Sequence, residues 1–341
     1  MAMALAIAIG IASGLLANWA GVPLPWMLGP MVGNTIAALA GARIGAPTPL
    51  RPFTIPVIGV MLGSGLSSEV LLGALHWWPS LIMLVPFLMV SGLVSYQFYR
   101  RLGRFDPVTA FFASMPGGLN DMVILGSAAG GDEKRIALAH ATRILVVIVF
   151  VVLFFGVYLG VTSNGQSRPY VGLGVLSATD AFWLVLCAVV GWPIAKFLRL
   201  PAPAMLGPMI LSGAAHVAGV VEVPPPSILI ICAQIILGTI IGCRFVGSSL
   251  NLIGKDMLLG AGSSLLMLGV ATGFAVFVAN FSGSDISQIF LAYSPGGLTE
   301  MSLLALAMGQ EVAFVSISHM ARITLVIFGA PLVFPYLQSR D

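Results

Sequence analysis

The feature that most restricts the fold of this chain is an internal repeat. Pro25-Trp-Met-Leu-Gly-Pro30 returns as Pro203-Ala-Met-Leu-Gly-Pro208, 178 residues later. Ser114-Met-Pro-Gly-Gly-Leu-Asn-Asp-Met122 returns as Tyr293-Ser-Pro-Gly-Gly-Leu-Thr-Glu-Met301, 179 residues later, and His140-Ala-Thr-Arg143 returns as His319-Met-Ala-Arg322 at the same distance. Self-similarity in one order at one spacing indicates a duplication. We therefore divide the chain into two repeats, residues 1–165 and 166–341.

The composition indicates that lipid is the solvent of both halves. Of the 341 residues, 58% are hydrophobic and 8% are charged, whereas soluble domains carry roughly 25% charged residues. No globule in water hides this much apolar surface, so we expect an all-α polytopic membrane protein. The basic residues are scattered through short loops, which argues against a nucleic-acid partner. Cysteines without metal-binding spacing and scattered histidines give no reason to expect a metal centre.

Each half contains six apolar elements, which we expect to be helical. Several are long enough to cross a hydrocarbon core about 30 Å thick, and the shorter ones need tilt or flanking residues. The first element follows no basic n-region and no Ala-x-Ala site, so we expect it to be a retained helix. The elements are residues 2–19, 25–41, 53–66, 79–98, 107–129 and 136–160, then 180–197, 203–219, 226–243, 257–281, 286–308 and 312–336.

The positions of lysine and arginine predict that the halves are inverted relative to each other. Basic residues favour the cytoplasmic ends of membrane spans. They follow the second and fourth elements in the first half, but the first and third elements in the second half. Equivalent loops then face opposite sides, so each half must cross the membrane an odd number of times. The basic residues that this scheme places inside are Arg43, Arg51, Arg100, Arg101, Arg104, Lys134, Arg135, Lys196, Arg199, Arg244, Lys255 and Arg340.

The fifth element of each half is the best candidate for a segment that enters and leaves on one side. Its centre carries Pro-Gly-Gly, in which proline breaks the helix and paired glycines favour a turn. We therefore expect two inverted-topology repeats, each with about five transmembrane helices plus one re-entrant hairpin, at 107–129 and 286–308. Both termini are then cytoplasmic, and Arg168 lies outside. The alternative, two kinked full spans, breaks the charge rule in one half.

The two Pro-Gly-Gly segments form the predicted binding site. Interrupted helices in inverted repeats indicate a transporter site near the bilayer midplane, and exposed backbone there must line protein or a watery cavity. The helix after each tip points amide donors at a ligand, and paired carboxylates suit Na⁺ coordination or proton exchange. Alternatively, Pro-Gly-Gly only makes a close helix crossing, the role we expect for Met-Leu-Gly-Pro. The site residues are Pro116, Gly117, Gly118, Asn120 and Asp121, and Pro295, Gly296, Gly297, Thr299 and Glu300.

A histidine and an arginine follow each hairpin. His140 and Arg143, like His319 and Arg322, are three residues apart and share one face of a helix. An arginine inside a membrane span is costly and faces a partner or a cavity. Two interpretations are open for the arginines: they bind an anionic substrate, or they form salt bridges to the hairpin carboxylates. The histidines either shuttle protons or make hydrogen-bonded helix contacts.

At Pro25–Pro30, Pro203–Pro208 and the two Pro-Gly-Gly-Leu segments, the sequence resembles the AbrB family of bacterial membrane proteins over nearly its whole length. Members are labelled as ammonia monooxygenases or as regulators of gene expression, and the resemblance implies a bacterial inner membrane. A copper monooxygenase needs clustered metal ligands, so we do not expect an enzyme. In architecture the predicted halves are similar to sodium-coupled glutamate and citrate symporters. That likeness implies that the two tips face each other, that the hairpin-bearing bundle moves like an elevator, and that the protein is a homodimer.

The prediction is an ion-coupled secondary transporter, in the lipid bilayer, for a small anionic or zwitterionic solute. Coupling would use Na⁺, bound at Asp121 or Glu300, or H⁺, and no cofactor is expected. The alternatives are a passive channel and a membrane-embedded regulator or sensor of gene expression that does not transport.

Overall fold

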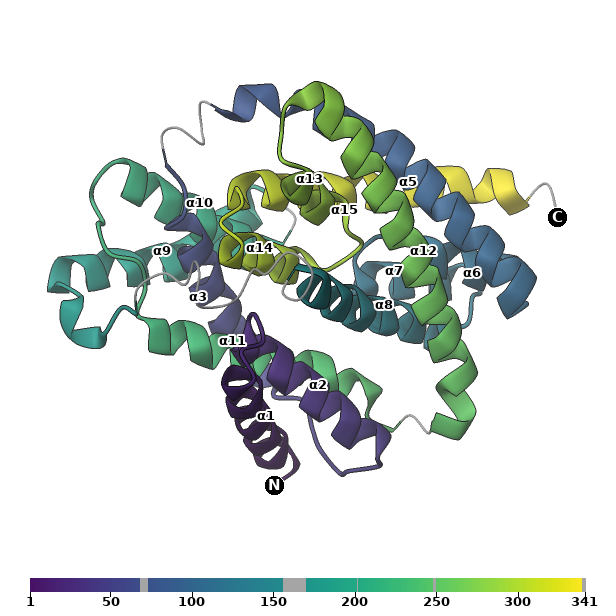
Figure 1. The fold of residues 1–341 in the computed structure, drawn as a ribbon, viewed down its shortest axis with the longest axis horizontal. Coiled ribbons are helices and arrows are strands. Elements are labelled where there is room, and N and C mark those ends of the chain that lie inside the picture. Colours follow the sequence, from purple (N-terminus) through teal and green to yellow (C-terminus); the bar gives the residue numbers. More distant parts are fainter. Residues whose placement is uncertain (68–72, 156–169, 201, 248–249, 339–341) are drawn as a thin grey trace. The chain divides into compact units, whose positions relative to one another are not determined.

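The computed structural model describes residues 1–341 except 68–72, 156–169, 201, 248–249 and 339–341 (Figure 1). These residues form α-helices joined by loops and by short 3-10 or π turns, and no strand occurs among them. The expected all-helical class is confirmed. The boundary between the two repeats and the end of the sixth element lie outside the described residues, as do Arg168 and Arg340.

The helices begin and end close to their expected bounds, and each fifth element is divided into two helices at Pro-Gly-Gly, as expected. The first half contains α1 (Ala2–Trp19), α2 (Pro25–Leu39), α3 (Arg51–Gly63), α5 (Trp78–Phe98), α6 (Pro107–Ser114), α7 (Leu119–Ala128) and α8 (Glu133–Leu153). The second half contains α9 (Ala178–Phe197), α10 (Pro203–Val217), α11 (Ser227–Gly242), α12 (Leu250–Ser282), α13 (Ile286–Tyr293), α14 (Leu298–Ala307) and α15 (Val312–Gln338).

Within the described segments, seven helices are long and apolar enough to cross a membrane. They are Ala2–Trp19, Trp78–Gly103, Glu133–Leu153, Ala178–Phe197, Ser227–Phe245, Gly254–Ser282 and Val312–Phe334. This number of apolar helices favours a multi-pass membrane protein. The inversion of the repeats, the re-entrant hairpins and the side on which the termini lie stay predictions.

The chain folds into two compact units, and each unit takes helices from both sequence halves. Unit 1 comprises Met1–Ala74, Val151–Ser248 and Ser302–Ala313, and unit 2 comprises Leu75–Phe150, Ser249–Met301 and Phe314–Asp341. Unit 1 therefore contains the first three elements of each half. Unit 2 contains the last three, apart from the ends of α8 and α14 and the start of α15. The units describe packing, whereas the division at residue 165 describes the sequence repeat.

In unit 1 the Met-Leu-Gly-Pro motifs mark close helix crossings. α1 packs on α2, and α9 packs on α10 (Figure 1). A side chain at Gly29 would overlap main-chain atoms of Ser13 and Gly14, and one at Gly207 would overlap main-chain atoms of Gly191. The glycine of each motif thus lets two backbones meet directly, as small residues do between membrane helices. The expected packing role is confirmed.

Gly207→Ala should lower the free energy of unfolding by about 1–3 kcal/mol, because the added methyl group meets the rigid backbone of α9. Gly269 in α12 faces open space. Gly269→Ala should therefore leave stability unchanged or raise it by up to about 1 kcal/mol, since alanine favours a helix. Thermal unfolding of the detergent-purified protein measures both. A loss of similar size in the two variants would contradict the close crossing.

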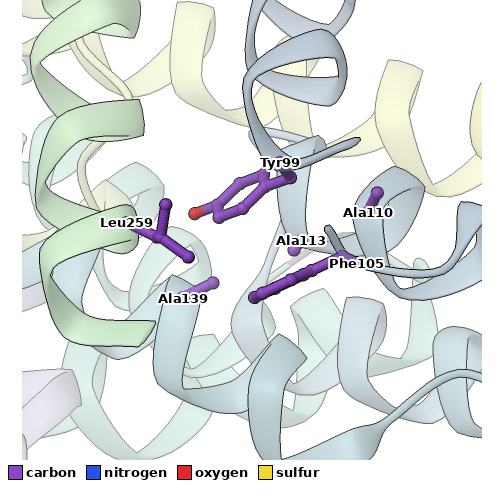
Figure 2. Close-up of a cluster of buried hydrophobic side chains, with 6 residues drawn as sticks. All are labelled: Tyr99, Phe105, Ala110, Ala113, Ala139 and Leu259. Atoms are coloured by element: carbon purple, nitrogen blue, oxygen red, sulfur yellow. The ribbon is translucent and has the colours of Figure 1, made fainter. Parts of the chain in front are cut away.

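Aromatic side chains build the interior of unit 2. Phe87 of α5 stacks on Tyr293 of α13, with ring centroids 5.0 Å apart, and meets Phe274 of α12 edge-on at 5.6 Å. The Tyr293 hydroxyl donates a hydrogen bond to the Ser80 carbonyl at 2.6 Å. A second cluster of buried side chains joins the end of α5 to α6, α8 and α12 (Figure 2): Tyr99, Phe105, Ala110, Ala113, Ala139 and Leu259. These contacts hold the long helices of unit 2 to the broken ones.

Candidate functional site

The Pro-Gly-Gly segments interrupt the fifth element of each half. Residues 115–118, here called the first break, separate α6 from α7, and residues 294–297, the second break, separate α13 from α14. Met115 and Ser294, which precede the prolines, have extended backbone with ψ of 126° and 134°. The proline ring disfavours helical backbone at the residue before it and removes a donor itself. The helices therefore end at the same point of both repeats.

An aspartate caps the start of the first helix in each pair. Asp106 accepts a hydrogen bond from the Thr109 amide at 2.9 Å, and Asp285 accepts one from the Ser287 amide at 2.6 Å. Partial burial raises the pKa of Asp106, but the hydrogen bonds that its carboxylate accepts from Thr109 and its neighbours lower the pKa by more. The pKa of Asp106 therefore lies below its ordinary value. Neither cap was among the expected site residues. The signal was present at Asp106, because an aspartate before proline and an apolar run is a helix start.

A buried arginine closes the break in each repeat. Arg143 Nη1 donates to the Met115 carbonyl at 2.9 Å, and its Nη2 donates to the Gly117 carbonyl at 3.3 Å. Carbonyls at the end of a helix lack intrahelical partners, and charge-assisted hydrogen bonds satisfy them strongly. The equivalent bonds in the second half run from Arg322 Nη1 to the Ser294 carbonyl at 2.5 Å and from Arg322 Nη2 to the Gly296 carbonyl at 2.6 Å.

A buried histidine supports each arginine one turn earlier on the same helix. His140 Nε2 donates to the Phe112 carbonyl at 2.9 Å, and His319 Nε2 donates to the Leu291 carbonyl at 3.0 Å. Both imidazoles are fully buried. Because a carbonyl only accepts, Nε2 carries the proton in both rings. We call His140 with Arg143 the first staple, and the equivalent pair in the second half the second staple.

The staples pin the breaks through main-chain oxygens. Arg143 is 5% exposed and Arg322 is 2% exposed, and a buried cation without hydrogen-bond acceptors is strongly destabilising. The breaks supply those acceptors, so each arginine needs its break as much as the break needs the arginine. Unit 2 thus holds positive charge in its interior.

The carboxylate that follows each break folds back over the glycine that precedes its helix. Asp121 and Glu300 lie in the first turns of α7 and α14. A side chain at Gly118 would overlap Asp121 Oδ2, and one at Gly297 would overlap Glu300 Oε2. The amide end of a helix stabilises negative charge there. The absence of a side chain at each glycine therefore leaves room for the carboxylate beside the break.

The first break also packs on the helix that contains the second staple. A Cβ atom at Gly117 would lie 2.8 Å from Val326 Cγ1 of α15. Val326 shares an apolar cluster with Met122 of α7, and Arg322 lies one turn before it on α15. The structure thus brings residues of both repeats together. All the predicted site residues lie in unit 2: Pro116, Gly117, Gly118, Asn120, Asp121, His140, Arg143, Pro295, Gly296, Gly297, Thr299, Glu300, His319 and Arg322.

Comparison with known proteins places this chain in a family. Residues 26–338 match the family described as "Transition state regulatory protein AbrB". The chain belongs to the AbrB family. It is 26% identical to "Uncharacterized protein YhjN" of Bacillus subtilis (strain 168), over 94% of this chain and 89% of that protein. It is 23% identical to "Putative regulator AbrB" of Escherichia coli (strain K12), over 93% of this chain and 91% of that protein.

In this AbrB chain the site offers complementary chemistry within one unit. Buried guanidinium groups attract an anion, and carboxylates near the breaks attract a cation or accept a proton. The helix starts after the breaks add amide donors and a positive dipole end. The arrangement offers groups suited to a small anion and groups suited to a cation or a proton.

Proposed function

We propose that this chain is an ion-coupled secondary transporter of a small anionic or zwitterionic solute in a bacterial inner membrane. The observation that supports this most is the duplicated broken helix. The same interruption, the same buried staple and the same folded-back carboxylate occur twice within one compact unit. Interrupted helices at membrane depth are tolerated where they are buried in protein or line a cavity. Secondary transporters bind ions and substrates at such half-helix ends.

Coupling follows from the charges near the breaks. The solute binds through a negatively charged group attracted by the arginines. Na⁺ or H⁺ binds at Asp121 or Glu300 and offsets charge that is costly in a buried site. Each ligand then favours binding of the other, which is the thermodynamic basis of symport.

Alternating access uses the division into two units. Unit 2, which contains the site, moves as the transported bundle, while unit 1 remains fixed and forms a homodimer. The support is that each unit takes equivalent elements from both repeats. With inverted repeats, exchange of two similar conformations between the halves turns an inward-open state into an outward-open one.

A regulatory role is the second candidate, because the family description and the name of the E. coli relative refer to regulation. In that case the same site senses a solute, and the signal passes to a partner. Transport and sensing differ in flux. A sensor binds the solute but leaves its movement across a liposome at background.

Thermal unfolding of the detergent-purified protein tests the transport proposal first. The panel consists of small carboxylates, amino acids and ammonium, each with Na⁺ or K⁺ at two pH values. A ligand that binds the folded state raises the unfolding temperature by mass action. We expect one solute class to do so in a Na⁺- or pH-dependent way, and uptake of that solute into proteoliposomes to follow the same ion. Binding without ion-driven uptake would overturn the transporter and favour the sensor.

Cysteine labelling tests the proposed topology. Lys134 and Glu222 are both exposed, and the topology places them on opposite sides of the membrane. In a background without the native cysteines, Lys134→Cys should react with an impermeant maleimide only from the cytoplasm, and Glu222→Cys only from outside. Labelling of Lys134→Cys from outside and of Glu222→Cys from the cytoplasm would show that the fifth element of the first half is a full span.

A further inference from the structure

The two staples differ in one hydrogen bond. In the first staple, Arg143 Nη2 donates to His140 Nδ1 at 2.6 Å. In the second, His319 Nδ1 has no hydrogen-bond partner within the described part of the chain, although the ring is fully buried. Arg143 therefore uses both protons of Nη2, whereas Arg322 uses one proton of Nη1 and one of Nη2. The second staple keeps one more donor, as well as one acceptor.

A buried hydroxyl adds to the second staple. Ser318 lies four residues before Arg322, on the same face of α15, and is fully buried. Among the described residues neither Ser318 Oγ nor Arg322 Nε has a hydrogen-bond partner. Buried polar atoms are almost always bonded to protein, water or ligand. Three such atoms within one helical turn indicate that something binds there.

The first repeat lacks this set. The residue equivalent to Ser318 is Ala139, which has no hydroxyl and lies in the apolar cluster with Tyr99, Phe105 and Leu259 (Figure 2). Arg143 Nε and Thr142 Oγ1 also lack a partner among the described residues, but Thr142 packs against Gly260 of α12 and His140 Nδ1 is satisfied. The first staple thus has a methyl group where the second has the Ser318 hydroxyl, and its histidine is closed by the hydrogen bond from Arg143. Its geometry is that of a structural contact.

We propose that the Ser318–Arg322 turn of α15 binds the carboxylate of the transported solute, and that the first staple is structural. The inference rests on the proposed transport function and assigns its anion site to one of the two repeats. Its donors, namely the Ser318 hydroxyl, Arg322 Nε and the unused terminal protons, outnumber its acceptors, His319 Nδ1 and the Ser318 oxygen, which matches an oxyanion. Arginine binds carboxylates through two parallel N–H donors, and Arg322 retains Nε for that geometry.

Paired variants test this assignment on the whole protein. The probes are the sodium salts of glycolate and succinate, with glycolamide and succinamide as controls that lack a carboxylate. At least one acid should raise the unfolding temperature while its amide does not. Ser318→Ala should lower the affinity for that acid by about tenfold or more, because a hydrogen bond to a charged group is lost. Ser318→Ala removes a hydroxyl that has no partner in the described structure, so the unliganded protein should be no less stable.

The controls use buried groups elsewhere in unit 2. Ser91 is also fully buried on α5 and, like Ser318, has no hydrogen-bond partner in the described segments. Ser91→Ala should keep the full acid-induced shift. Arg322→Lys should abolish the acid-induced rise in unfolding temperature, because lysine cannot present two parallel N–H donors to a carboxylate. Arg143→Lys should lower the unfolding temperature of the unliganded protein but keep the acid-induced rise.

The outcomes separate this inference from the transport proposal. Loss of the shift in Arg143→Lys but not in Arg322→Lys would overturn the assignment, and so would equal effects of Ser318→Ala and Ser91→Ala. No shift with any of the acids, or a shift with the amides alone, would show that the turn binds only water. Ion-driven uptake of a solute without a carboxylate would then leave the transporter standing. Acid binding at this turn without flux of the acid across the membrane would instead overturn the transport proposal and support the assignment of the anion site.

Discussion

Ion-driven uptake should disappear in Asp121→Asn and Glu300→Gln, while both variants still fold and insert. Each change removes a negative charge but keeps nearly the same volume and the side chain's hydrogen-bonding capacity. A cation site loses most of its affinity without the carboxylate, and a proton site loses its titratable group. We expect gradient-driven uptake to fall to the background of empty liposomes. The free energy of unfolding, measured by thermal unfolding of the same preparations, should change by less than about 1 kcal/mol.

Glu133→Gln provides the matched control. Glu133 is an exposed carboxylate at the start of α8, in the same unit but away from both breaks. Its neutralisation should leave uptake at the wild-type level. If Asp121→Asn and Glu300→Gln both transported like Glu133→Gln, neither carboxylate would belong to the coupling site. Loss in only one of them would assign the ion to one repeat.

The broken helices could be predicted because the interruption is local chemistry. Proline and paired glycine act on the backbone next to them, so Pro116 and Pro295 fixed the positions of the breaks without any tertiary information. The packing role of Met-Leu-Gly-Pro was predictable for the same kind of reason, since small residues let helices approach. The two units were not predictable from hydropathy. Which helices pack together depends on side-chain contacts between segments more than a hundred residues apart.

The partners of the arginines show where local reasoning ends. The spacing of His140 and Arg143 predicted one shared helix face, which the structure has. One expected partner was a carboxylate, because acidic residues can be read directly from the sequence. The other was an anionic substrate. The partners that the structure shows include main-chain carbonyls 26 and 28 residues away, and such acceptors exist only because the helix ends there. Every residue type has a carbonyl, so no sequence pattern marks the acceptors.

The difference between Ser318 and Ala139 was visible in the sequence but could not be interpreted there. An alignment of the two repeats places a hydroxyl opposite a methyl group, which by itself indicates nothing about function. Burial gives the difference its meaning, because an exposed serine would bond to water and a buried one must find another partner. The functional information of a duplicated chain thus lies partly in the positions where packing makes the repeats unequal.

Gly118→Ala and Gly297→Ala should impair transport strongly with little loss of stability. Neither glycine has a positive φ, so alanine can adopt the backbone at both positions. The added methyl group would meet the end of a flexible side chain, Asp121 at Gly118 and Glu300 at Gly297. The carboxylate is therefore displaced while the helix remains. We expect stability to change by less than about 1 kcal/mol and uptake to fall by about tenfold or more, since displacement by about 1 Å is costly in a preorganised site.

Gly273→Ala, at a position of α12 that faces open space, should leave both quantities near wild type. The double variant Gly118→Ala with Asp121→Asn decides how the glycine acts. If Gly118 matters only because it makes room for the carboxylate, the double variant should transport no worse than Asp121→Asn alone, because coupled residues are not additive. Independent effects that multiply would mean that the backbone of Gly118 itself contacts the solute. The comparison of ion-driven uptake in the three variants therefore separates a glycine that positions an acid from one that binds a ligand.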